Sequence, residues 1–262
     1  MIEHILFVFE GAKTEKIIVN SLLRFFLEDD ERRVIKSSFN TDIYTLYKEI
    51  KDDEDLDIFS LIKERNAELN DYTRDMFSQV FLFFDYDGHS NSASDDKIKK
   101  LLDFFCEETD KGKLYISYPM IESLKCISNL NDEDAFYNYS YPISECSNFK
   151  NHVSEYACNS LIHFNYYTKK CWCSVIRLHC SKANFLLKGD KLFPTSNIEQ
   201  NDIFEIQKDN FIVPDRKISV LGAFPFLLLD YFGATSLSEQ VIGMPILNDT
   251  ALPQQVVNDF GS

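Results

Sequence analysis

Acidic side chains follow two stretches of the sequence that have the pattern of buried strands. Glu10 comes directly after the apolar run 4–9, and Asp85 and Asp87 follow the apolar run 77–84. Continuous apolar runs of this length are typical of strands buried on both faces of a parallel sheet. In such sheets the ligand site lies outside the carboxyl ends of the strands. The three carboxylates are therefore expected near one crevice, although they are far apart in the sequence.

The spacing of Asp85 and Asp87 indicates a site for a divalent cation. Side chains two residues apart on a strand lie on the same side, and Gly88 allows the backbone to turn away immediately afterwards. Two carboxylates directed at one point repel each other unless a cation lies between them. Mg²⁺ or Mn²⁺, which prefer oxygen ligands, are the expected cofactors. The alternative is structural, since aspartates at strand ends also cap helices and form turns.

The stretches around these motifs predict alternating strands and helices. We expect Thr14 to cap the first helix, and Thr41 or Asp42 to cap the second. The predicted strands are 4–9, 33–39, 77–84 and 113–118, and the predicted helices are 17–26, 42–50, 58–69, 95–109 and a short one that Glu122 opens. This alternation predicts an α/β fold, with a parallel sheet flanked by helices.

The character of the sequence changes after about residue 130. Four aromatic-rich segments there are expected to be mainly helical: 148–167, 170–188, 197–210 and 216–231. We therefore expect an α/β domain over residues 1–130. Residues 131–262 would form a mainly helical extension or second domain.

Composition indicates a packed protein and argues against broad nucleic-acid binding through a basic surface. The chain has 262 residues, of which 45% are hydrophobic, and it contains 23 phenylalanines. This is ample apolar material for a core and excludes a disordered chain. The formal net charge is −15, whereas proteins that grip nucleic acid directly usually carry a basic patch. To bind nucleic acid, this protein would need phosphate contacts made through a bound metal, or a basic partner. The alternative is that the acidity serves only to keep the chain in solution.

The seven cysteines and the hydropathy pattern favour a cytoplasmic protein with reduced thiols. No apolar stretch reaches the length of a membrane span, and no signal peptide is evident, so no membrane association is expected. Cys171, Cys173, His179 and Cys180 do not have the spacing of a structural zinc site, and a buried helix is the favoured interpretation.

Three short motifs resemble those of the Toprim domain, which is shared by topoisomerases, primases and the OLD-like and RloB-like nucleases of bacterial defence. They are FVFEGAKTE (7–15), FLFFDYDGH (81–89) and YPMIESLK (118–125). The Glu-Gly and Asp-x-Asp strand ends are the Toprim pattern, and EGAKTE and the Pro–hydrophobic–Glu element are similar to the RloB-like form. The resemblance covers roughly residues 1–130, with an insertion implied around 50–75.

The resemblance implies metal-dependent cleavage of phosphodiester bonds in DNA or RNA. Asp85 and Asp87 would hold Mg²⁺ or Mn²⁺, and Glu10 would bind a metal or act as a general acid or base. Glu122 would be a further ligand or an orienting group. Lys13 would contact the scissile phosphate.

The family also implies a biological setting and partners. Such nucleases serve as effectors of anti-phage defence that are toxic when activated, as in abortive infection. The sequence contains no P-loop motif, so a separate ATPase or sensor protein is the expected partner alongside the nucleic-acid substrate. A homo-oligomer is compatible with the sequence.

Two other functions remain open at this point. FLFFDYDGH also resembles the Asp-x-Asp-Gly motif of haloacid dehalogenase-like phosphatases, in which Asp85 would be the nucleophile and Asp87 the acid/base. The third interpretation is an interaction module that keeps a Toprim scaffold without catalysis, since a fold does not fix a function.

Overall fold

A five-stranded, mostly parallel sheet forms the centre of the protein. The computed structural model describes residues 4–27, 33–51 and 56–243. The strands are β1 (His4–Phe9), β2 (Arg33–Ser38), β3 (Phe77–Asp85), β4 (Cys106–Glu107) and β5 (Gly112–Ser117). Their order is β2-β1-β3-β5-β4, and only the short edge strand β4 is antiparallel to its neighbour. The prediction of an α/β fold with a parallel sheet is confirmed.

The central strands β1 and β3 contain continuous apolar runs because both of their faces are covered. Residues 5–9 of β1 and 80–84 of β3 are all buried. The register places Phe9 beside Phe83, with ring centroids 5.7 Å apart. Phe83 in turn stacks on Tyr115 of β5 at 5.4 Å. This aromatic row joins three neighbouring strands and fixes the relative position of their carboxyl ends.

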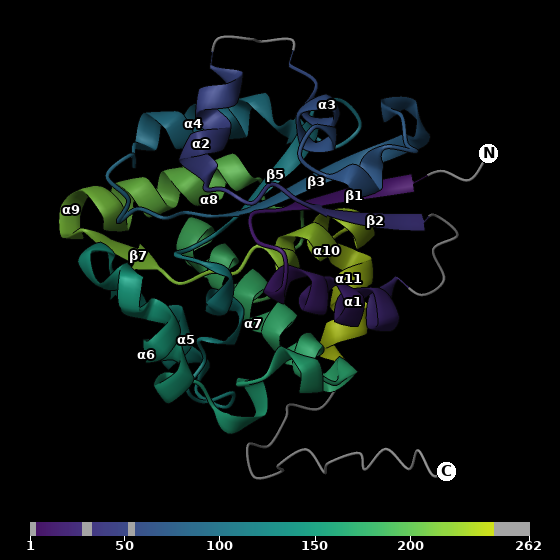
Figure 1. Cartoon of the computed structure of the whole chain (residues 1–262). Helices are drawn as coiled ribbons and strands as arrows, with labels where there is room; N and C mark the ends of the chain where they lie inside the picture. Colours follow the sequence, from purple (N-terminus) through teal and green to yellow (C-terminus); the bar gives the residue numbers. More distant parts are fainter. Residues whose placement is uncertain (1–3, 28–32, 52–55, 244–262) are drawn as a thin grey trace, which may run out of the picture.

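Helices cover both faces of the sheet, as predicted. Figure 1 shows α2, α3 and α4 on one side and α1, α7, α10 and α11 on the other. The first group is α2 (Ile43–Ile50), α3 (Ile58–Lys63) and α4 (Asp95–Phe104), and the second is α1 (Thr14–Phe26), α7 (Lys169–Lys188), α10 (Phe224–Phe232) and α11 (Ala234–Ile242).

Several predicted boundaries in the first half are wrong. The helix predicted to reach residue 109 ends at Phe104, because Cys106–Glu107 pairs with the start of β5. The helix predicted at 58–69 ends at Lys63, and a separate 3-10 turn follows at Ala67–Leu69. Thr14 does not cap α1, which has Lys13 at its N-cap position and no capping hydrogen bond from that side chain. Part of the acidic stretch 51–57, predicted to be a loop, lies outside the described residues.

The C-terminal part is mainly helical but also contains a small antiparallel sheet. Its remaining helices are α5 (Glu133–Tyr137), α6 (Phe149–Tyr156), α8 (Gln200–Gln207) and α9 (Val213–Asp215). The predicted helix 216–231 is wrong at its start, where β7 (Lys217–Ser219) pairs with β6 (Ser140–Pro142) and the helix begins only at Phe224. The predicted helix 148–167 ends at Tyr156 and is followed by two 3-10 turns.

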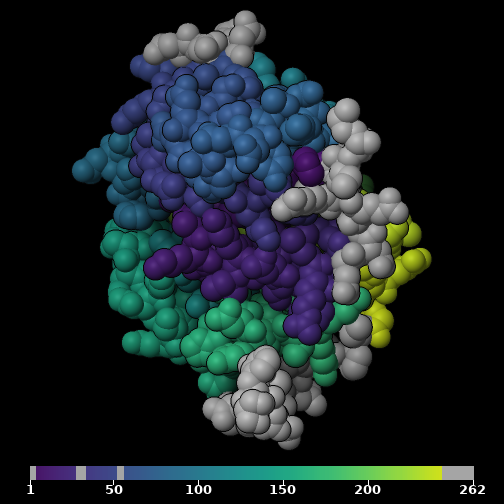
Figure 2. Space-filling view, turned by 45° about the vertical axis from the view of Figure 1, so that its right-hand side comes forward, coloured from purple at the N-terminus to yellow at the C-terminus, as the bar shows by residue number. Residues whose placement is uncertain are grey.

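The two halves of the chain share one hydrophobic core. Phe224 of α10 stacks on Phe83 of β3, with ring centroids 4.4 Å apart and planes inclined by 7°. On α7, Trp172 donates its indole N–H to the Ser21 hydroxyl of α1 at 2.8 Å. Figure 2 shows α1, in purple and indigo, lying between the blue residues above it and the green C-terminal residues below. Among the described residues, no helix is both long and apolar enough to cross a membrane.

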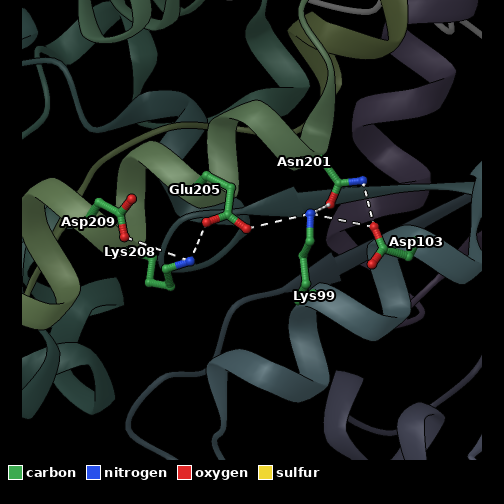
Figure 3. A network of polar contacts seen from close by, with 6 residues as sticks. All are labelled: Lys99, Asp103, Asn201, Glu205, Lys208 and Asp209. Atoms are coloured by element: carbon green, nitrogen blue, oxygen red, sulfur yellow. Dashed lines mark hydrogen bonds and ion pairs between the residues drawn. The ribbon is translucent and has the colours of Figure 1, made fainter.

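A polar network joins α4 of the first half to α8 of the second (Figure 3). Lys99 Nζ donates to Asn201 Oδ1 at 3.2 Å and lies 3.5 Å from Glu205 Oε1. Asn201 also donates to Asp103 Oδ1 at 3.1 Å. These groups are half-buried or exposed, so we expect the network to orient the two helices more than it stabilises them.

Candidate active site

The carboxyl ends of β1 and β3 meet at the two acidic motifs. Glu10 follows β1, and its Oε2 accepts a hydrogen bond from the backbone N–H of Asp85, the last residue of β3, at 3.0 Å. The Glu10 backbone N–H donates to Phe83 O at 3.0 Å, and its carbonyl accepts from Asn40 N at 2.9 Å. The sheet hydrogen bonding thus continues past the ends of the strands and holds Glu10 between its neighbours. The structure places Glu10 and Asp85 together, as the strand-end rule predicts.

The backbone conformation at Asp87 differs from the extended one expected. Its φ is 47°, so the chain has left the strand and entered the left-handed region, instead of continuing with strand alternation. Gly88 is needed for space and not for a positive φ: an added Cβ would lie 2.2 Å from Cε1 of the Tyr86 ring.

Glu122 is buried beside the same strand ends, whereas Lys13 is exposed. Glu122 lies in the 3-10 turn Ile121–Lys125 after β5 and is 5% exposed. Its Oε1 is 3.6 Å from Nζ of Lys150 on α6. Glu122 is also close enough to raise the pKa of Asp85. Lys13 stands at the start of α1, the element that follows Glu10.

Burial and mutual repulsion make these carboxyl groups hold protons tightly. Burial, followed by the charges of Asp87, Asp42 and Glu15, raises the pKa of Glu10 to about 8, although the Asp85 N–H opposes the shift. The pKa of Asp85 is raised well above its usual range by burial and then by Glu10, Asp87 and Glu122. The main electrostatic property of the site is therefore the cost of ionising its carboxyl groups.

The pKa of Asp87 is also raised, but a neighbouring histidine opposes the shift. Burial is the largest cause, and the charge of Asp42 adds to it. His89, exposed on the following loop, lowers the pKa of Asp87. His89 is thus an electrostatic neighbour of the candidate ligands.

Two acidic residues at the site were not predicted as members of it. Asp42 and Glu15 line an open depression together with Glu10 and three neighbours, Gly11, Asn40 and Thr41. Asp42 caps α2 as predicted, accepting from Thr45 N at 2.9 Å, and Glu15 Oε1 accepts from Gly11 N at 3.0 Å. Asp42 follows the carboxyl end of β2, so the strand-end rule that selected Glu10 could also have selected it.

The donor set suits a hard divalent cation in its chemistry, although the side chains are not gathered around one point. Every candidate ligand is a carboxylate, the type of donor that Mg²⁺ and Mn²⁺ prefer. Within the described ranges, no three Asp, Glu, His or Cys side chains form a group arranged to hold a metal ion. Binding would therefore require rotation of side chains and release of the protons that the raised pKa values of Glu10, Asp85 and Asp87 favour, and the charge of a bound cation would lower these pKa values.

His179 of the cysteine-rich helix makes hydrogen bonds through both ring nitrogens. Nδ1 accepts from Gly222 N at 3.1 Å, and Nε2 lies 3.4 Å from Leu124 O. Burial lowers the pKa of His179 to about 3. These contacts give the neutral ring a structural role between α7 and two loops.

Comparisons of the chain with protein-family models, curated proteins and solved structures found no match. The interpretation of the site therefore depends on its geometry and on the motif resemblance.

Proposed function

We propose that this protein is a metal-dependent nuclease that hydrolyses phosphodiester bonds of DNA or RNA. The observation that supports the proposal best is the hydrogen bond from Asp85 N to Glu10 Oε2, which brings the Glu-Gly and Asp-x-Asp motifs together at adjacent strand ends. The charges of nearby Asp87 and Glu122 raise the pKa of Asp85, and the charge of Asp87 also raises the pKa of Glu10. A site of this kind is suited to a divalent cation and a phosphate substrate.

Each carboxylate has a distinct role in the proposal. Asp85 and Asp87 hold Mg²⁺ or Mn²⁺, and Glu122 is a further ligand or orients one. A bound ion supplies positive charge that offsets the charge of the scissile phosphate. Glu10, whose pKa is raised to about 8, can release or accept a proton near neutral pH and is suited to general acid–base work. Lys13, which is exposed at the start of α1, contacts the phosphate.

The biological setting is part of the proposal and comes from the motif resemblance. The protein acts in the cytoplasm as an effector of bacterial anti-phage defence and is toxic when activated. Its net charge of −15 opposes tight binding of nucleic acid without help. A separate ATPase or sensor that brings the substrate to the site is therefore the proposed partner.

Cleavage assays on DNA and RNA test this proposal. With Mg²⁺ or Mn²⁺ the wild-type protein is expected to cleave at least one class of nucleic acid, and chelation is expected to stop the reaction. Asp85→Asn should reduce cleavage to background, because one charged oxygen donor is lost while the size of the side chain is kept. Asp57→Asn, at the cap of α3, is the matched control and should cleave normally. Equal cleavage by both variants would contradict the proposal.

A further inference from the structure

Tyr86 separates the two candidate metal ligands of the Asp-x-Asp motif and is more deeply buried than either of them. It is 2% exposed, whereas Asp85 and Asp87 on either side are only partly buried. The tyrosine therefore enters the core, while the two aspartates keep part of their surface exposed.

Both peptide groups that join Tyr86 to these aspartates are anchored by hydrogen bonds. The N–H of the Asp85–Tyr86 peptide donates to Ser117 O at 3.0 Å and to Pro119 O at 3.1 Å. The carbonyl of the Tyr86–Asp87 peptide accepts from the hydroxyl of Tyr44 at 2.8 Å. Tyr44 belongs to α2 and is fully buried. Its hydroxyl thus constrains the peptide that precedes Asp87, at the point where the backbone turns left-handed.

The side chain of Tyr86 is held at its other end. Its hydroxyl donates to Asp95 Oδ1 at 2.8 Å, and Asp95 is the first residue of α4. The ring packs against Tyr118, with centroids 5.6 Å apart, and Gly88 leaves just enough room beside it. The loop that carries Asp85 and Asp87 is therefore attached to β5, α2 and α4 at once.

We propose that Tyr86 is a positioning residue, which, together with the Tyr44 hydroxyl, sets the direction of Asp85 and Asp87. The inference depends on the proposed function in that these aspartates are taken to be metal ligands. Groups hydrogen-bonded to metal ligands orient them, and their loss commonly weakens metal binding about ten- to a hundredfold. The two tyrosine hydroxyls act through the backbone next to the ligands, so we expect the lower end of this range. Neither tyrosine needs to touch the metal or the substrate for this effect.

Single hydroxyl deletions in the full chain test the inference. Tyr86→Phe and Tyr44→Phe each keep the aromatic ring and remove one hydrogen bond. Tyr137→Phe is the matched control, because the Tyr137 hydroxyl donates to Glu133 Oε2 at the same 2.8 Å and Tyr137 lies in α5. The dissociation constant for Mn²⁺ should rise about tenfold or more in the first two variants and stay unchanged in the control. Thermal melting, measured without metal, shows whether any of the variants has lost its fold.

The possible outcomes separate this inference from the proposed function. Equal Mn²⁺ affinity in all three variants and the wild type would overturn it, because the hydroxyls would then serve packing alone. Failure of the wild type to bind Mn²⁺ would count against the proposed metal site, and amide hydrogen exchange in metal-free protein would then decide the inference. Faster exchange at Asp87 and Gly88 in Tyr44→Phe and Tyr86→Phe than in the control would support it. Identical exchange would overturn it.

Discussion

Glu10 shows how a buried carboxyl group can reduce the stability of the fold at a pH where it must ionise. Its pKa is raised to about 8 from an ordinary 4.5, with burial the first cause and neighbouring carboxylates the next. The folded protein therefore keeps a proton on Glu10 that the unfolded chain has already released in the range between these values. Asp85 and Asp87, whose pKa values are also raised, act in the same direction.

Metal-free protein should consequently lose stability as the pH rises through this range. Below about pH 4.5 the Glu10 carboxyl is protonated in both states and costs nothing, and the cost is complete above about pH 8. The loss from Glu10 is on the order of a few kcal/mol. The melting temperature of the wild type, measured in chelator, should fall steadily between about pH 5 and about pH 9, the range over which Glu10 titrates.

Glu10→Gln should make this fall shallower and leave the variant more stable than the wild type at the alkaline end. The amide oxygen can still accept from Asp85 N, while the charge is gone. A variant with the same pH dependence as the wild type would mean that Glu10 is not the carboxyl that holds the proton.

Asp42 illustrates at the scale of elements how a helix cap can also belong to the site. Its Oδ1 accepts from Thr45 N at 2.9 Å at the start of α2, and its charge raises the pKa of Glu10. The cap depends on an acceptor oxygen, whereas the pKa effect depends on the charge.

The two roles of Asp42 can be separated by substitution. Asp42→Ala should cost about 1 kcal/mol in the free energy of unfolding, measured with urea. Asp42→Asn should keep most of that stability and lower the pKa of Glu10, followed by NMR titration. Asp57 makes an equivalent cap on α3, so Asp57→Ala should cost a similar amount without moving the pKa of Glu10. If Asp42→Asn leaves that pKa unchanged, Asp42 does not belong to the electrostatic site.

The sequence predicts long, strongly patterned elements well and short ones poorly. β1 and β3 were recognisable because continuous apolar runs are needed where both faces of a strand are covered. β4, β6 and β7 have two or three residues each, too few for an alternating pattern to stand out. Asp87 lies close enough to Glu10 to raise its pKa. Its left-handed backbone could not be predicted, because it depends on contacts that Tyr86 makes with residues distant in the sequence.

At the scale of the whole molecule, the C-terminal half completes the core on which the strand ends depend. The sequence indicated aromatic helices there but not the element they would cover. Phe224 stacks on Phe83, two residues before Asp85, and also lies 6.5 Å from the ring of Phe9, which precedes Glu10. The residues that hold both acidic motifs in place are thus packed against α10. Such long-range pairings leave no local signal in a single sequence.

The central claim is that the acidic strand ends bind a divalent cation, and calorimetric titration with Mn²⁺ tests it most directly. The wild type should bind Mn²⁺, and the double variant Asp85→Ala, Asp87→Ala should not, with Asp57→Asn binding like the wild type. The fold of each variant is checked first by circular dichroism. Equal heats of binding in the double variant and the wild type, or no binding to folded wild-type protein, would contradict the account.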